Sequence, residues 1–287
     1  MTRHLSLKRE IVEICRFLAR KDYVSAMDGN VSVRIGEDRF LTTPTMVHKA
    51  FIREDDLVVV NGRGEKIGGC EARHPTSEVF MHLAAYRRRP EIRAVVHAHP
   101  PTAVAFTVAG ETLARCVLPE VVLTLGQIPT APYETTGTQA LADRVGEMLS
   151  TFDALIMERH GVITIGRDLI DAFGKMEKVE HTALITWRAR TLGGVRELDC
   201  DEVSRLRELG KKYSSRGQAP PPCEGCGGCP SGIPWQDNPS FPIGRMAFHV
   251  SGDEPASPAK ACSSGLESIV MEEVVRALGP SRGSGQS

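Results

Sequence analysis

The sequence predicts a layered α/β domain followed by an irregular C-terminal extension. Short runs rich in β-branched residues alternate with longer stretches in which apolar residues recur at helical spacing. After about residue 209 the composition changes, and proline, glycine, serine and cysteine dominate. We therefore predict a folded domain over residues 1–209 and a partly disordered extension over 210–287.

The order of elements follows from these patterns. Helices are expected where one face is apolar, and strands where apolar residues alternate or form short β-branched runs. The expected helices are residues 7–19, a segment from Thr76 to just before Pro90, residues 138–150, a long helix after Asp168, and residues 265–279. The expected strands are residues 29–36, 40–43, 57–60, 92–100, 121–125 and 154–157.

Charge and composition favour a small-molecule protein. The 35 basic and 36 acidic side chains give a net charge of -1, so nothing indicates nucleic acid or an anionic membrane surface as a partner. The chain has no uninterrupted apolar stretch of 18 residues and no signal-peptide core at its N-terminus. We expect a cytoplasmic protein that binds a small molecule or further copies of itself.

The eight cysteines do not form the pattern of a disulfide framework. Cys223, Cys226 and Cys229 repeat a CxxC spacing, and together with Cys262 they could bind a structural zinc ion or an iron–sulfur cluster. The alternative is a flexible tail with free thiols.

Three histidines are candidate metal ligands. His97 and His99 are two residues apart on an expected strand, so their side chains share one face at the end of that strand. His160 follows another expected strand. Three imidazoles with an open position describe a catalytic zinc site, although His99 could also end a strand and His160 could merely occupy a turn.

Polar residues before the second helix are candidates for substrate binding. Thr76 and Ser77 would place free backbone N–H groups near an anion such as phosphate, and Glu78 could act as metal ligand or base. Alternatively, Glu78 only complements the helix dipole. Gly29 permits close backbone approach beside the amide of Asn30.

Together these blocks resemble the class II aldolase/adducin family. The similarity is carried, in order, by GNVSVR, TPTMVHKA, HPTSEVFMHLAAYRRRP, AVVHAHPPTAVAFTVAG, LPEVVLTLGQIPTAPYETTGT and ERHGVITIG, within about Leu7 to Arg190. The resemblance implies a three-layer α/β/α catalytic domain with a central, mainly antiparallel sheet. It also implies a homotetramer with its site at the subunit interface.

The resemblance assigns roles residue by residue. His97, His99 and His160 would bind Zn2+, or another divalent metal such as Mn2+, Co2+ or Fe2+, and Glu78 would be the acid/base group. The residues at positions that hold substrate phosphate in the family are Gly29, Asn30, Thr45, Thr76 and Ser77. Such a site implies a metal-dependent lyase that cleaves a small phosphorylated ketose by retro-aldol chemistry through a metal-stabilised enediolate.

Two departures leave the reaction open. Met46 replaces the glycine that follows the family's phosphate-binding threonine, and Glu120 stands in the block where members of the family have a tyrosine acid. A glutamate in this block resembles the pattern of the methylthioribulose-1-phosphate dehydratases. A sugar-phosphate dehydratase or a decarboxylase is therefore the alternative. Tyr133 is a second candidate proton carrier. A non-catalytic, adducin-like interaction module is the alternative from a different class.

Overall fold

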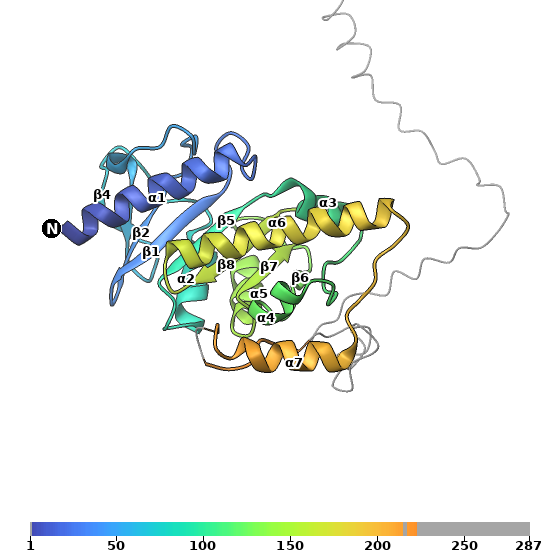
Figure 1. Cartoon of the computed structure of the whole chain (residues 1–287). Coiled ribbons are helices and arrows are strands. Elements are labelled where there is room, and N and C mark those ends of the chain that lie inside the picture. Colours follow the sequence, from blue (N-terminus) through green and yellow to red (C-terminus); the bar gives the residue numbers. More distant parts are fainter. Residues whose placement is uncertain (1, 215–216, 223–287) are drawn as a thin grey trace, which may run out of the picture. The chain divides into compact units, whose positions relative to one another are not determined.

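A single eight-stranded sheet with helices on both faces forms the centre of the molecule (Figure 1). In this computed structural model, residues 2–214 and 217–222 are described. The strand order is β4-β3-β2-β1-β5-β8-β7-β6, and every neighbouring pair is antiparallel except β6 with β7. The predicted three-layer α/β/α fold with a mainly antiparallel sheet is confirmed.

The strands are β1 (Asn30–Gly36), β2 (Arg39–Thr42), β3 (Val58–Val60), β4 (Lys66–Gly69), β5 (Ala94–Ala98), β6 (Thr130–Ala131), β7 (Ala154–Met157) and β8 (Gly161–Gly166). The helices are α1 (Thr2–Arg20), α2 (Val79–Arg88), α3 (Pro101–Val108), α4 (Pro119–Thr124), α5 (Gln139–Leu149), α6 (Leu169–Thr191) and α7 (Cys200–Gly210), with a 3₁₀ turn at Glu54–Asp56.

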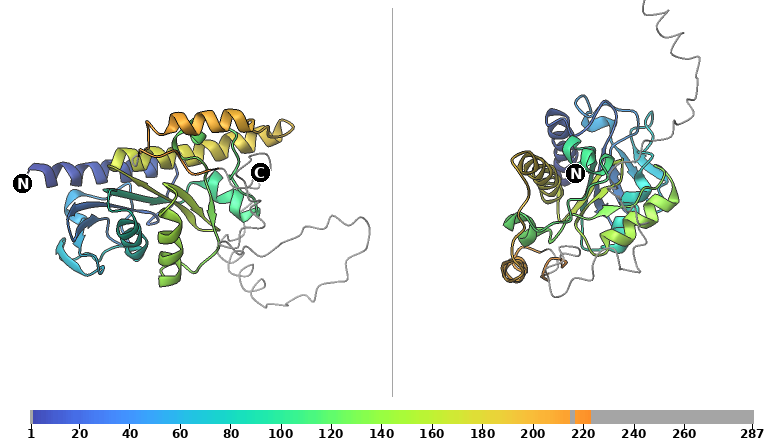
Figure 2. Two further views of the ribbon diagram at one scale, coloured as in Figure 1. Left: turned by 90° about the horizontal axis from the view of Figure 1, so that it is seen from below. Right: turned by 90° about the vertical axis from the view of Figure 1, so that its right-hand side faces the viewer.

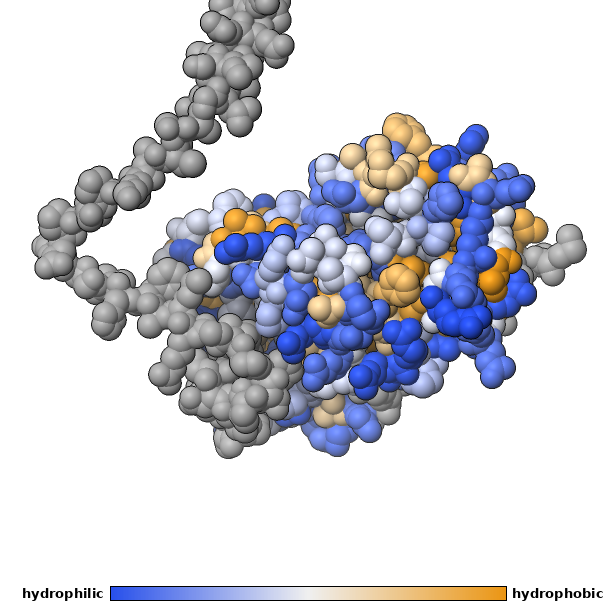
Figure 3. Space-filling model, turned by 180° about the vertical axis from the view of Figure 1, so that it is seen from behind, coloured by the Kyte–Doolittle hydropathy of each residue, from blue (hydrophilic) through white to orange (hydrophobic). Residues whose placement is uncertain are grey.

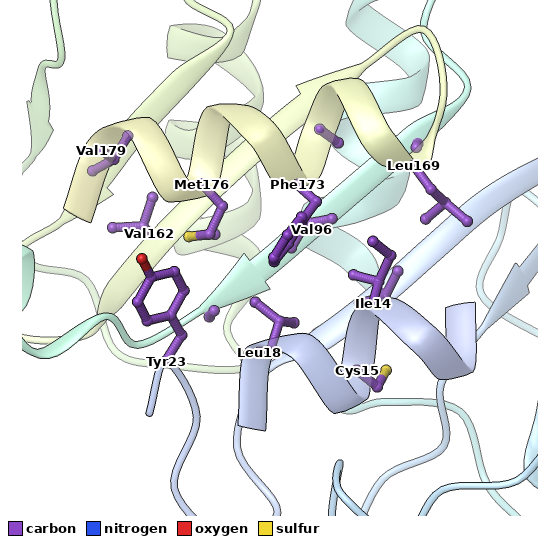
Figure 4. Packing of buried hydrophobic residues seen from close by; sticks show 14 of the residues in the cluster. Ile14, Cys15, Leu18, Tyr23, Val96, Val162, Leu169, Phe173, Met176 and Val179 are labelled. Carbon is purple, nitrogen blue, oxygen red and sulfur yellow. The ribbon is translucent and has the colours of Figure 1, made fainter. Parts of the chain in front are cut away.

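Helices α1, α3 and α6 cover one face of the sheet. Ile14 and Leu18 of α1 pack beside Phe173 and Met176 of α6, over Val96 of β5 (Figure 4). These apolar residues recur at helical spacing, so each helix buries the stripe that the sequence predicts. This packing supports the central strands from behind.

Helices α2 and α5 cover the opposite face (Figure 2). They approach closely because Gly146 has no side chain: a Cβ there would lie 2.9 Å from the Cβ of Ala84. Thr138 begins α5 by accepting a hydrogen bond from the backbone N–H of Leu141, as expected for a helix N-cap. Helix α2 is therefore held between α5 and the sheet.

Some local expectations were wrong. Residues 121–125 were expected to be a strand because they are β-branched and apolar, but Pro119 begins the short helix α4 there. Val121 and Val122 then pack into two different hydrophobic clusters, so tertiary packing outweighs strand propensity. Thr76 was expected to cap helix α2, but the helix begins at Val79 with Glu78 as its N-cap residue, two residues later than expected. Strands β4, β6 and β8 were not predicted.

The expected cysteine site and the late helix over residues 265–279 lie outside the described residues. The expected boundary at residue 209 stays a prediction, and α7 ends beside it at Gly210. Segment 217–222 contacts α7, because Arg207 donates a hydrogen bond from Nε to the backbone oxygen of Pro220.

The surface of the described residues carries small apolar groups separated by hydrophilic side chains on the face shown in Figure 3. Within the part of the chain that was searched, no helix is long and apolar enough to cross a bilayer.

The packing between α1 and α6 predicts a large stability loss for Leu18→Ala. Leu18 is fully buried, so the substitution removes its contacts and leaves a cavity, which should lower the free energy of unfolding by about 2–5 kcal/mol. Leu5→Ala on the same helix is the control, because Leu5 is 47 % exposed and should change stability by less than about 0.5 kcal/mol. Urea unfolding measures both, and equal losses would contradict the proposed packing.

Candidate metal centre

The structure brings His97, His99 and His160 together. His97 is the fourth residue of β5, His99 follows that strand, and His160 lies in the turn between β7 and β8. One potential ligand atom from each side chain lies within 4.8 Å of the other two. Their rings are steeply inclined to one another, with interplanar angles of 59–70° and centroid separations of 4.8–5.1 Å.

The turn that carries His160 is shaped by its neighbours. Arg159 has a φ of 55°, a left-handed conformation that costs about 1–2 kcal/mol for a residue with a Cβ. Gly161 has no Cβ, and a Cβ there would lie 2.6 Å from both the backbone oxygen of Ala98 and Cδ2 of His99. Gly161 thus makes room for a candidate ligand, a role that the sequence reading missed.

The donor set suits a divalent metal. Nδ1 of His97 donates to the backbone oxygen of Val162 over 2.9 Å, which leaves its Nε2 free as a ligand. Nε2 of His99 lies 3.0 Å from that atom. Two nitrogens that share one zinc ion at about 2.0–2.1 Å must lie within about 4.2 Å of each other. In addition, Nδ1 of His160 is buried with no hydrogen-bond partner among the described residues.

Glu78 lies between two of the histidines. Its Oε2 is 3.3 Å from Nε2 of His97 and its Oε1 is 3.0 Å from Nε2 of His160. Burial acts to raise the pKa of the Glu78 carboxyl, but the charge and hydrogen bonds of both histidines outweigh burial and hold that pKa below its usual range. Burial acts to lower the pKa of His97, but the nearby Glu78 carboxylate outweighs burial, and the pKa of His97 is raised. Glu78 is therefore a half-buried anion that faces His97 and His160.

His99 is held in the neutral form that a metal requires. Burial and the nearby His97 lower its pKa from 6.5 to about 3. Nδ1 of His99 points to Asp28 at 3.7 Å.

The candidate phosphate-binding residues lie on three connected segments. Asn30 donates from Nδ2 to Oε2 of Glu78 over 2.8 Å. A β-bridge joins Pro44 to Pro75, and the backbone N–H of Thr76 donates to the oxygen of Thr43. These contacts bring the segments carrying Thr45, Thr76 and Ser77 beside that of Glu78; Thr76 is buried, Thr45 half-buried and Ser77 exposed.

Gly29 has a structural requirement at this place. Its φ is 72°, and a Cβ would lie 2.5 Å from a side-chain carbon of Val24 and 3.0 Å from the backbone oxygen of His97. The chain can therefore pass close to β5 only with glycine.

Met46 keeps the backbone shape that a glycine would favour. Its φ is 55° and its side chain is 70 % exposed. The loop thus retains the left-handed turn while the methionine side chain points outward.

Lys49 is a further buried cation that the sequence reading missed. It is 1 % exposed and donates to the backbone oxygens of Met27 and Val47 over 2.8 and 2.9 Å. Burial lowers its pKa. Lys49 ties the segment before Gly29 to the segment after Thr45.

Glu120 and Tyr133 are not part of the cluster. Glu120 is exposed in the first turn of α4, and in the described part of the chain its carboxylate makes no hydrogen bond or ion pair with Glu78 or the three histidines. The Tyr133 side chain is 57 % exposed.

The fold and the site define one class of protein. It is a layered α/β domain that carries three histidines and a carboxylate at one end of its sheet. The model of the Class II Aldolase and Adducin N-terminal domain matches residues 9–187. The chain belongs to the class II aldolase and adducin family.

Individual relatives carry two different activities in their names. The chain is 34 % identical over 178 residues to an L-fuculose phosphate aldolase of Methanococcus maripaludis, covering 62 % of this chain and 94 % of the relative. It is 30 % identical over 213 residues to a 3-oxo-tetronate 4-phosphate decarboxylase of Haemophilus influenzae, covering 72 % and 99 %. A solved structure of L-fuculose 1-phosphate aldolase superposes with a TM-score of 0.65 at 28 % identity, covering 71 % and 95 %.

The histidine geometry predicts that His99→Ala removes metal binding without unfolding the protein. Loss of one of three nitrogen ligands should weaken zinc affinity by more than about 100-fold, because even outer partners of such sites contribute 10–100-fold. Zinc titration with a competing chelator measures this effect, and circular dichroism reports the fold. His181→Ala is the control, since His181 is exposed on α6. Unfolding of the His99 variant would instead indicate a structural metal.

Proposed function

We propose that the protein is a divalent-metal lyase that cleaves a small phosphorylated ketose by retro-aldol chemistry. The observation that carries this proposal is the placement of Glu78, a half-buried carboxylate directly between His97 and His160. A general acid/base must lie within hydrogen-bond reach of the reacting centre, and Glu78 has that position relative to the candidate metal ligands. Retention of all three histidines argues against a non-catalytic interaction module.

The roles of the residues follow from their positions. His97, His99 and His160 would hold zinc or a similar divalent ion, which supplies Lewis-acid stabilisation of the negative charge that develops on the substrate when its bond breaks. Glu78 would move the proton at the substrate carbon next to the metal, and Glu120 or Tyr133 would accept the hydroxyl proton of the departing aldehyde. Asn30 donates to Oε2 of Glu78, the oxygen next to His97, and Oε1 faces His160.

A phosphate group on the substrate is the second part of the proposal. The named activities of both relatives act on phosphorylated compounds. In this chain the segments that carry Thr45, Thr76 and Ser77 are joined beside the start of α2, where the helix dipole favours an anion. Met46, which replaces the family's glycine, is compatible with this proposal because it has a left-handed backbone conformation and an exposed side chain.

Decarboxylation is the second candidate. The similarity to the 3-oxo-tetronate 4-phosphate decarboxylase extends over 213 residues, further than the similarity to the aldolase. Stabilising negative charge at the same carbon would serve loss of carbon dioxide as well as loss of an aldehyde. A dehydratase would use the same site and requires a base such as Glu120.

The proposed homotetramer would explain how Glu120 takes part. Its carboxylate is exposed and, among the described residues, makes no hydrogen bond or ion pair with the cluster of its own chain, so a site shared between subunits would give it a role. We propose this arrangement for Glu120 and treat Tyr133 as its rival.

The proposal predicts which products form. The zinc-loaded protein should convert a phosphorylated ketose into an aldehyde and a shorter ketose phosphate, identified by mass spectrometry. The unphosphorylated analogue should react much more weakly, and Ser77→Ala should cost about 1–3 kcal/mol of apparent binding through a lost charged hydrogen bond. Release of carbon dioxide from a phosphorylated 3-oxo acid would replace the aldolase with the decarboxylase. Equal turnover of the phosphorylated and unphosphorylated substrates would contradict the proposal that these residues bind phosphate.

A shared interface predicts a specific behaviour of Glu120→Gln. Zinc content should persist while the catalytic constant falls about 10²–10⁴-fold, the usual contribution of a general acid/base. Subunits with Glu120→Gln mixed with subunits carrying His99→Ala should regain activity, because some interfaces would then contain one intact site. The activity of the mixed assembly, compared with each variant alone, measures this. Near-normal turnover by Glu120→Gln would assign the role to Tyr133 or Glu78.

A further inference from the structure

A chain of buried polar side chains leads away from Glu78 into the protein. Asn30 donates from Nδ2 to Glu78 and its Oδ1 lies 2.6 Å from Nε2 of His82. Nδ1 of His82 lies 2.7 Å from Oγ of Ser32, and that hydroxyl lies 3.0 Å from the hydroxyl of Tyr86. The roles described so far use the first two residues of this chain and leave the other three unexplained.

The direction of these hydrogen bonds is fixed by the charge of Glu78. The carboxylate only accepts, so the Asn30 amide nitrogen must face it and the amide oxygen must face His82. His82 then carries its proton on Nε2, and its Nδ1 accepts the hydroxyl proton of Ser32. The single hydroxyl proton of Tyr86 is then shared between Oγ of Ser32 and the backbone oxygen of Arg93, which lies 3.4 Å away. With a neutral ring, the opposite tautomer of His82 would place two acceptors face to face, Oδ1 of Asn30 and Nε2 of His82.

Burial makes this arrangement expensive to break. Asn30, Ser32, His82 and Tyr86 are each at most 3 % exposed, so water cannot replace a lost partner. A buried polar group without a partner costs about 1–3 kcal/mol. Burial and the nearby His97 also lower the pKa of His82 to about 3, which keeps its ring neutral and its Nδ1 free to accept.

The chain connects the two elements that define the site. His82 and Tyr86 belong to α2, directly after Glu78, whereas Asn30 and Ser32 belong to β1. Asn30 is paired with His97 in the sheet. The hydrogen bond of His82 to Asn30 therefore sets the orientation of an amide that connects Glu78 with the strand next to the metal ligands.

We propose that His82 is a positioning residue that orients the Glu78 carboxylate through Asn30. This inference rests on the proposed function of Glu78 as acid/base. The Nε2–H of His82 keeps the amide nitrogen of Asn30 directed at Oε2 of Glu78, and Oε1 remains directed at His160. Without His82, the amide oxygen of Asn30 loses its buried partner, and the contact with Glu78 alone holds the amide, so the carboxylate is less firmly oriented.

Two substitutions of similar polarity separate this role from simple packing. Nε2 of glutamine lies the same number of bonds from Cα as Nε2 of histidine, so His82→Gln can still donate to Asn30. The amide of asparagine corresponds to Nδ1, so His82→Asn can contact Ser32 but cannot reach Asn30. In the zinc-loaded full chain, His82→Asn should lower kcat about 10–100-fold with little change in KM, and His82→Gln should retain most of the turnover.

The glutamate variant provides the matched control. In a Glu78→Gln background, His82→Asn should cause no further loss of kcat, since the carboxylate that it orients is gone. His181→Asn, on the exposed face of α6, controls for the helix preference of asparagine. Equal losses for the Gln and Asn variants, or the same further loss with and without Glu78, would show that His82 only supports the fold.

A measurement on the unaltered protein tests the arrangement independently of activity. Nitrogen NMR of the zinc-loaded chain labelled with [15N]histidine should show His82 neutral and protonated on Nε2. Protonation on Nδ1 would overturn the proposal, because Nε2 could not then donate to Asn30. If the wild type turns over no candidate substrate, the proposed function fails, whereas the NMR result still decides which atoms of His82 and Asn30 face each other.

Discussion

The antiparallel register of β1, β5 and β8 is the constraint on which the site depends. It pairs Asn30 with His97 and Ala98 with Val162, and it brings the turn before β8 beside the end of β5. A shift by one residue would turn His97 to the other face of the sheet. The helices on both faces bury these three strands, and the register is therefore fixed by the apolar pattern of the core.

Buried polar groups at this end of the sheet satisfy one another instead of contacting water. The negative charge of Glu78 offsets the cost of burying His97 and raises the pKa of that histidine. The same interaction lowers the pKa of the Glu78 carboxyl. The amide oxygen of Asn30 in turn forms a hydrogen bond with His82 on α2. Removing one member leaves others unpaired in a region of low dielectric, so the site behaves as a connected unit.

At several positions around the site, the backbone passes so close to neighbouring segments that only certain residue types fit. Gly29 and Gly161 occupy places where a Cβ would meet the backbone or the ligand side chains. Arg159 and Met46 adopt left-handed conformations without being glycine, next to a candidate ligand and next to the candidate phosphate segment. Unfavourable backbone conformations of this kind tend to occur at functional sites, where the surrounding fold holds them in place.

The sequence by itself determined the layered fold, most helices, and the strand that carries His97 and His99, because periodicity and the two-residue spacing are local properties. Only the tertiary structure decided that His160 meets this pair, since their distance depends on how β5 pairs with β8. It also decided that residues 119–124 form a helix, because packing against two clusters outweighs the local preference of valine for strands. His82 looked like one residue of a helix, and its partners became visible only when α2 was packed against β1, because hydrogen bonds between distant segments leave no periodic trace in a sequence.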